Sequence, residues 1–421
     1  MDAAPPGQRP RLPLPGAAAD VLESLPPELL NAILSRLPLR DAVRTSALAR
    51  AWRRRWQSVP SLKFEWDERA NPGAVTCVLQ RYSYPVREFR HSAVREASFR
   101  DSDRWLRLLE LKGVQILHLD FRRSHRGLVV HTLDSSIFSC RELTSLYLRG
   151  CDVPTTPPGF AGLPNLTSLR LSNVGFPEGA RELQLLIATS PMLEALSLTL
   201  LRLPYSDDGN GHWVIQAPKL RFFHIADILY HGWMISDLPS LEEARIECPF
   251  DHDFVKHMAG LARARSLHLE IEVGDDNILE GLSCTFNDLK CLTLDTSLSL
   301  LSSVLSVFCL LRNAPKLENL YFEVNDISSE HDEVDIDFLN AQWTGDMLSK
   351  LICINVVGMI CTLSEMNFIK FVLSKARRLE EFHVCIDEDC SKSNEAVVTE
   401  LVKYRRASPR AKVFFERMSD G

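Results

Sequence analysis

The chain has 421 residues, of which 45% are hydrophobic and 24% charged, and its formal net charge is −7 at pH 7. This composition is typical of a globular protein with more than one domain. The negative charge argues against a nucleic-acid partner, and the longest apolar stretch, residues 298–311, is too short to cross a bilayer, so we expect no membrane partner. The eleven cysteines include no Cys-x-x-Cys pair, which argues against disulfides and structural zinc and favours a reducing compartment, the cytoplasm or nucleus.

The N-terminal part combines an irregular tail with a compact helical pattern. Residues 1–19 are rich in Pro, Ala, Gly and Arg and lack periodicity, so we expect a disordered tail and not a signal peptide. Residues 20–60 predict three helices. Pro26 suits the start of the first helix, Pro38 stops it, and Asp41 is placed to cap the second.

These helices carry more apolar surface than about 40 residues can bury well. Aliphatic residues repeat at helical spacing along the first helix, and two tryptophans four residues apart are predicted on the third. The apolar set is Leu25, Pro26, Leu29, Leu30, Ile33, Leu34, Leu37, Pro38, Trp52 and Trp56. Besides a docking surface, two interpretations are open: the stripe is ordinary core, or Arg50 and residues 53–55 form a basic recognition helix.

The same segment resembles an F-box. Residues 25–30 match the family's Leu-Pro-x-x-Leu-Leu, and residues 33–38 match Ile-Leu-Ser-x-Leu-Pro. The similarity continues through residues 40–46 and the tryptophan pair in the manner of plant F-box proteins, with Ala49 and Ala51 as small departures. The resemblance implies that the apolar set contacts a Skp-type adaptor, which is itself bound to a cullin and a RING protein.

From about residue 112 the chain repeats itself. The template Leu-x-x-Leu-x-Leu, with other apolar residues allowed, recurs at spacings of 29, 23, 27, 27, 21, 23, 25, 28, 34 and 28 residues, mostly within the range of leucine-rich repeats. Its middle positions are Leu117, Leu146, Leu169, Leu196, Phe223, Ala244, Leu267, Leu292, Leu320, Ile354 and Phe382. Pro-x-Leu opens five units, and because proline cannot continue a preceding helix, it marks the return to the inner strand.

The repeats predict a curved solenoid over residues 112–340, with outer helices at 182–189 and 300–312. Residues 61–111 are interpreted as a linker with irregular early strands. Residues 341–421 resemble the FBD region that follows leucine-rich repeats in plant F-box proteins and are expected to continue the solenoid. The residues that carry this resemblance are 343–348, 379–382 and 405–413. The fold class is thus α/β, with an N-terminal three-helix F-box followed by a curved leucine-rich-repeat solenoid.

One residue of each predicted strand lies between the two inward positions and is expected to face out on the concave sheet. These residues include the candidates for binding a target protein: His118, Tyr147, Arg170, His224, Arg245, His268, Tyr321 and His383. The column is completed by Ser197, Thr293 and Asn355. Two interpretations are open. Either these residues occur at solvent-exposed positions by chance, or their aromatic, histidine and arginine side chains form a recognition groove. His224 and His268 are expected about 10 Å apart, too far to share one metal ion.

The sequence lacks several common catalytic and cofactor-binding motifs. It has no phosphate-binding loop, dinucleotide fingerprint, His-Glu-x-x-His or nucleophile elbow. Residues 251–253 with His257 predict a loop surface and not a metal site. We therefore expect no enzymatic activity, cofactor or metal. The resemblance implies a substrate-recognition subunit of an SCF-type E3 ubiquitin ligase; the alternative is a repeat scaffold or small-ligand receptor that is not coupled to ubiquitination.

Overall fold

The computed structural model describes residues 25–48, 52–58, 61–65, 73–93, 101–121, 130–204, 212–229, 231–248, 254–271, 277–324, 334–345 and 347–418. The predicted tail, residues 1–19, lies outside these ranges. The chain divides into two compact units, residues 1–124 and 125–421. Among the residues described, no helix is both long enough and apolar enough to cross a membrane.

The N-terminal unit begins with a small helical module. It consists of α2 (Pro27–Leu34), α3 (Leu39–Arg44) and the 3-10 turns η1 (Thr45–Ala47) and η3 (Arg55–Ser58). Pro26 and Pro38 occupy the N-cap positions of the two α-helices, so Asp41 lies in the first turn of α3 and not at the cap predicted for it. The segment around Trp56 forms a 3-10 turn where the sequence predicted an α-helix.

The rest of this unit is a parallel sheet with helices between its strands. The elements are β1 (Ser61–Glu65), α4 (Gly73–Arg81), β2 (Glu88–Ala93), α6 (Ser102–Leu111) and β3 (Ile116–Phe121). The early strands expected within residues 61–111 are thus present, but they are regular members of a sheet and not irregular, and the predicted linker did not include the helices between them. The register pairs Phe89 with Leu117 and His91 with Leu119. Phe89 fits the middle template position, but the polar His91 takes the place of the last template leucine, which is why the template does not detect β2.

The C-terminal unit is built on one parallel sheet. Its strands, in spatial order, are β5 (Ser145–Arg149), β7 (Ser168–Ser172), β8 (Ala195–Thr199), β10 (Phe222–Ala226), β12 (Glu243–Glu247), β13 (Ser266–Glu270), β14 (Cys291–Thr296), β15 (Asn319–Val324), β16 (Cys353–Met359), β17 (Glu381–Ile386) and β18 (Lys412–Arg417). The last strand, β18, has no counterpart among the predicted template positions. It pairs with β17 and extends the sheet toward the C-terminus.

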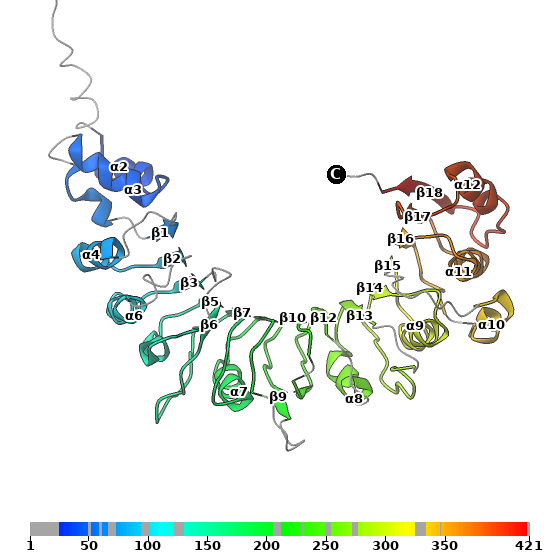
Figure 1. Ribbon diagram of the computed structural model, residues 1–421, viewed down its shortest axis with the longest axis horizontal. Helices are drawn as coiled ribbons and strands as arrows, with labels where there is room; N and C mark the ends of the chain where they lie inside the picture. Colours follow the sequence, from blue (N-terminus) through cyan, green and yellow to red (C-terminus); the bar gives the residue numbers. More distant parts are fainter. Residues whose placement is uncertain are drawn as a thin grey trace, which may run out of the picture. The chain divides into compact units, whose positions relative to one another are not determined.

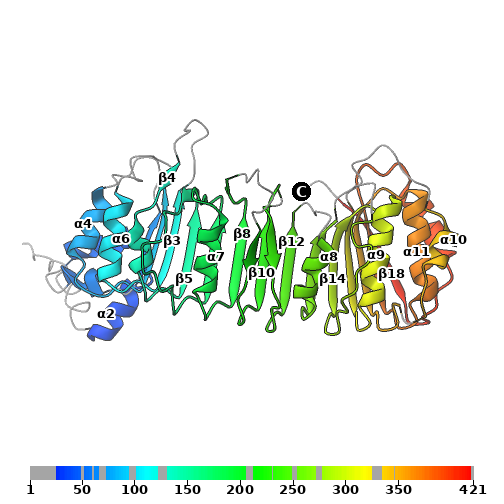
Figure 2. The same cartoon turned by 90° about the horizontal axis from the view of Figure 1, so that it is seen from below.

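The segments that connect these strands lie on one face of the sheet (Figure 1; Figure 2). They include α7 (Ala180–Ala188), α8 (Phe254–Met258), α9 (Leu301–Asn313), α10 (Ile336–Ala341), α11 (Leu363–Lys375), α12 (Asn394–Val402) and the 3-10 turns η4 (Ser135–Ser139) and η5 (Ala259–Leu261). The helices predicted at residues 182–189 and 300–312 are α7 and α9. Elsewhere short parallel strand pairs lie in the connections: β4 (His131–Thr132) with β6 (Cys151–Asp152), and β9 (Trp213–Ile215) with β11 (Trp233–Ile235).

The predicted inward positions form the core between the strands and this outer layer. Each middle template residue of the C-terminal unit lies one residue inside the start of its strand and is no more than 2% exposed. Leu169, for example, is paired with Leu146 on one side and Leu196 on the other. The strand positions and the register predicted from the repeats are therefore confirmed.

This register predicts unequal effects of substitutions at two consecutive residues of β7. Leu169 is fully buried between its neighbours, so Leu169→Ala should reduce the free energy of unfolding by roughly 2–5 kcal/mol through lost packing and a residual cavity. Arg170 points to the exposed face, so Arg170→Ala should cost less than about 0.5 kcal/mol. Urea or thermal unfolding of the two variants measures the difference. Equal losses would contradict the assigned register.

His91 predicts a pH dependence of stability in the N-terminal unit. The imidazole is fully buried, with its ring centroid 4.5 Å from that of Trp105, and burial lowers the pKa of His91 from 6.5 to about 4. The unfolded chain therefore takes up this proton at a higher pH than the folded chain does. The stability linked to His91 is complete above pH 6.5 and falls by about 1.4 kcal/mol per pH unit as the pH drops toward 4.

Urea unfolding across this pH range should therefore show a flatter pH profile for His91→Gln than for the unchanged chain. His212→Gln is the matched control, because His212 is exposed and its replacement should leave the profile unaltered. Identical profiles for all three proteins would show that His91 does not titrate differently in the folded and unfolded states.

Candidate binding surfaces

Four of the residues predicted to contact an adaptor form the interior of the helical module. Leu30 and Leu34 of α2 are 1% and 0% exposed, and Trp52 and Trp56 are 3% and 7% exposed. α2 contacts the 3-10 turn η3 that carries Trp56. These side chains hold the module together and, because they are buried, do not themselves present a surface to a partner.

The other face of α2 carries an exposed apolar stripe, defined here as Leu29, Ile33 and Leu37. These side chains are 52%, 41% and 37% exposed. They follow one another at intervals of four residues, so they line up along one side of the helix and its C-terminal turn. The remaining predicted residues are half-buried or exposed at the two ends of the helix: Leu25, Pro26 and Pro38. A continuous apolar stripe on the surface of a small module is typical of an interaction site.

The column predicted on the open face of the sheet exists as an unbroken ladder in the C-terminal unit. Each member lies directly opposite the next on the neighbouring strand: Tyr147, Arg170, Ser197, His224, Arg245, His268, Thr293, Tyr321, Asn355 and His383. Phe414 of β18 extends the ladder beyond His383. His118 belongs to the N-terminal unit and pairs with Arg90 of β2. The positions are as predicted, whereas target binding stays a prediction.

A network of histidines and carboxylates occupies the middle of the ladder. His224 Nε2 lies 3.4 Å from Glu247 Oε2, and His268 Nε2 lies 3.9 Å from Glu247 Oε1. His268 Nε2 is also 3.1 Å from Asp295 Oδ2. Arg245 forms an ion pair with Glu247. Glu247 thus connects His224 and His268, which the sequence predicted only as separate members of the column.

The sequence prediction missed the acidic residues beside the ladder. Glu247 and Asp295 each lie two residues after a ladder residue, at the next outward position of their strand. Glu270 and Glu323 occupy the same position on β13 and β15, and both are in register with Asp295. Extending the period-two pattern by one outward position would have found all four. Together they make this part of the open face acidic, which favours cationic groups on a partner.

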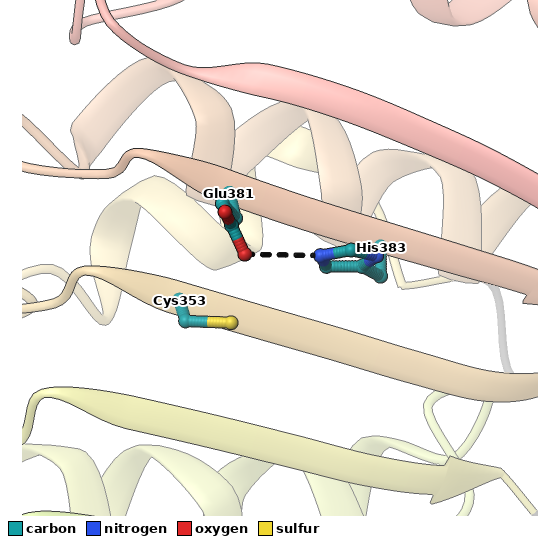
Figure 3. A group of neighbouring side chains, drawn as sticks. All are labelled: Cys353, Glu381 and His383. Carbon is teal, nitrogen blue, oxygen red and sulfur yellow. Dashed lines mark hydrogen bonds and ion pairs between the residues drawn. The ribbon is translucent and has the colours of Figure 1, made fainter.

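A second cluster, Cys353, Glu381 and His383, lies nearer the C-terminal end of the sheet. Figure 3 shows the three side chains on the same face of β16 and β17. His383 Nε2 lies 3.3 Å from Glu381 Oε2, and the potential ligand atoms of the three residues lie within 4.8 Å of one another. Burial raises the pKa of the Cys353 thiol, and the negative charge of Glu381 adds to the effect.

The structure describes only His257 of the polar cluster considered in the sequence. Residues 251–253 lie outside the described ranges. His257 lies in α8, where it is buried with its ring centroid 5.3 Å from that of Trp233, so it is a core residue and not part of a loop surface.

Two family models and several plant proteins match this chain. A family model described as FBD-associated F-box protein At5g56370, LRR repeats, matches residues 102–322, and an F-box domain model matches residues 22–64. Neither model describes an enzymatic domain. The F-box/FBD/LRR-repeat protein At1g13570 of Arabidopsis thaliana is 25% identical over 95% of this chain and 99% of its own length. The FBD-associated F-box protein At4g10400 of the same plant is 30% identical, over 72% of this chain and 76% of its own.

Among solved structures, the LRR protein LIC12759 of Leptospira interrogans aligns with 86% of this chain and 91% of its own, at a TM-score of 0.32 and 12% identity.

Proposed function

The chain belongs to the plant FBD-associated F-box proteins with leucine-rich repeats, and we propose that it is the substrate-recognition subunit of an SCF-type ubiquitin ligase. F-box domains in general bind Skp-type adaptors. In the proposed complex the adaptor links this chain to a cullin and a RING protein, while the repeats hold a target protein near the ubiquitin-charged enzyme. Ubiquitin transfer is then promoted by proximity, and this chain needs no catalytic residue of its own.

The exposed apolar stripe on α2 is the observation that carries the proposal. Leu30 and Leu34 anchor one side of α2 in the module, which leaves Leu29 and Ile33 on the other side with no described cover. Full burial of an exposed aliphatic side chain is worth roughly 1.5–3 kcal/mol, and because Leu29 and Ile33 are 52% and 41% exposed, docking gains about half of that at each. We therefore propose that the stripe contacts the adaptor and that the buried residues act indirectly, by holding the stripe in place.

We further propose that the target binds the open face of the sheet at the ladder. The support is the position of the ladder, whose side chains are half-buried or exposed, and its content of aromatic and arginine residues, which are enriched at interface hot spots. The acidic residues beside His224, Arg245 and His268 suit a target segment that carries positive charge. The proposed site of action is the cytoplasm or nucleus, because the cysteine spacing in the sequence is not that of a secreted disulfide framework.

The first test distinguishes a loss of adaptor binding from a loss of folding. The double variant Leu29→Ala, Ile33→Ala should weaken adaptor binding by more than about 2 kcal/mol, because a few buried anchors supply most of the energy of an interface. Calorimetry with the purified adaptor measures the affinity, and thermal unfolding checks that the variant is folded. Leu185→Ala, at a similarly exposed leucine of α7, is the control and should leave adaptor binding unchanged.

Unchanged adaptor affinity in a folded double variant would rule out the stripe as the contact. Failure of the unchanged chain to co-purify with adaptor and cullin would instead favour the repeat scaffold that is not coupled to ubiquitination.

The second test concerns the target, which proximity labelling in native cells with the proteasome inhibited would identify. The triple variant His224→Ala, Arg245→Ala, His268→Ala removes the middle of the ladder and should lose the target while retaining the adaptor. The double variant Arg181→Ala, Lys370→Ala changes exposed charges on the helices and should retain both. Normal binding of both partners by the triple variant would place target recognition outside this part of the ladder.

A further inference from the structure

The cluster of Cys353, Glu381 and His383 brings three good metal donors to one place on the open face of the sheet (Figure 3). We propose that these residues bind a zinc ion through Cys353 Sγ, a Glu381 carboxylate oxygen and His383 Nε2, in a site that keeps one coordination position open. The site does not depend on the proposed role in ubiquitination.

The sheet fixes the geometry of the site. Cys353 and Glu381 are direct neighbours across the β16–β17 pair, and His383 is the next outward residue of β17. All three donors therefore come from the regular part of two paired strands and none from a loop. Zinc–ligand distances of about 2.0–2.3 Å place the donors of a tetrahedral site about 3.3–3.6 Å apart. His383 Nε2 and Glu381 Oε2, at 3.3 Å, already have this separation, and the thiol is within the same 4.8 Å cluster.

The donor chemistry selects zinc over the hard divalent cations. A thiolate and an imidazole with one carboxylate suit zinc, whereas magnesium and calcium prefer sites made only of oxygen atoms. The His383 ring is held in orientation by stacking on Phe414, with centroids 4.6 Å apart and an interplanar angle of 15°. Beneath the site, Ile354 and Phe382 belong to the apolar core, which limits access of water from that side.

The other cluster on this face is a weaker candidate. Glu247, His268 and Asp295 also have potential ligand atoms within 4.8 Å of one another. However, Glu247 already forms an ion pair with Arg245, whose fixed positive charge opposes a divalent cation. This cluster also lacks a thiolate, so it does not distinguish zinc from other divalent ions.

Three protein ligands leave a fourth position directed away from the sheet. Zinc sites with three protein ligands hold water or an exogenous ligand at that position. On metal binding, the thiol proton of Cys353 is released to solvent and the thiolate coordinates the ion. A histidine, cysteine or carboxylate of a bound partner could then replace the water, so the metal would add a strong contact at the end of the ladder.

Cobalt(II) tests the site, because it replaces zinc in such sites and gives a near-ultraviolet charge-transfer band only when a thiolate is a ligand. The full chain, freed of metal with a chelator, should develop this band with one equivalent of cobalt, and zinc should abolish it by displacement. Cys353→Ser should remove the band, and Glu381→Gln should weaken cobalt binding by about tenfold or more.

Cys385→Ser is the matched control, because Cys385 is an outward thiol on β17, the strand of Glu381 and His383, but lies outside the cluster. It should keep the band. Thermal unfolding and the circular dichroism spectrum of each variant show whether the chain remains folded.

The absence of a band from the unchanged chain would overturn the proposal. So would a band that persists in Cys353→Ser or disappears equally in Cys385→Ser. If Cys353→Ser does not fold, Glu381→Gln decides the matter, and unchanged cobalt affinity in that variant would also overturn it.

Discussion

The lateral pairing of parallel strands in one register is the constraint on which the rest of the C-terminal unit depends. Because side chains alternate along a strand, a register shared by all strands gathers Leu146, Leu169 and Leu196 into one core and Tyr147 and Arg170 into one exposed ladder. A slip by one residue would exchange the two faces and place the leucines in water. The apolar core therefore specifies which side chains form the exposed ladder, although the ladder residues themselves do not belong to the core.

The helix α2 likewise has a buried side and an exposed side. Leu30 and Leu34 are buried against the module, so Leu29 and Ile33 are held outward on the same short helix. The helical period separates the two pairs, but it does not tell which pair faces the tryptophans, since both are apolar. This is why the sequence could assign all the apolar residues to an adaptor contact without dividing them into a core set and a surface set.

The sequence predicts most of the repeat architecture because its signal is local. A template of six residues gives the position and face of β3, β5, β7, β8, β10 and β12–β17, and the ladder follows from it. The short pairs β4–β6 and β9–β11 in the connections do not match the template. The template fails where a polar residue takes a leucine position, as His91 does in β2. It also cannot detect contacts made across strands. Cys353 and Glu381 are 28 residues apart, and only the pairing of β16 with β17 makes them neighbours.

The same pairing also concentrates like charges. Glu270, Asp295 and Glu323 occupy directly opposite positions on three consecutive strands, an arrangement that destabilises a sheet relative to alternating charges. His268 Nε2 lies 3.1 Å from Asp295 Oδ2, so the imidazole provides a hydrogen-bond partner for one of these carboxylates. A partner that brings positive charge to this face would relieve the repulsion among them. Such a partner binds the folded sheet and not the unfolded chain. Relief of the repulsion would therefore strengthen binding and would also raise the free energy of unfolding of the complex.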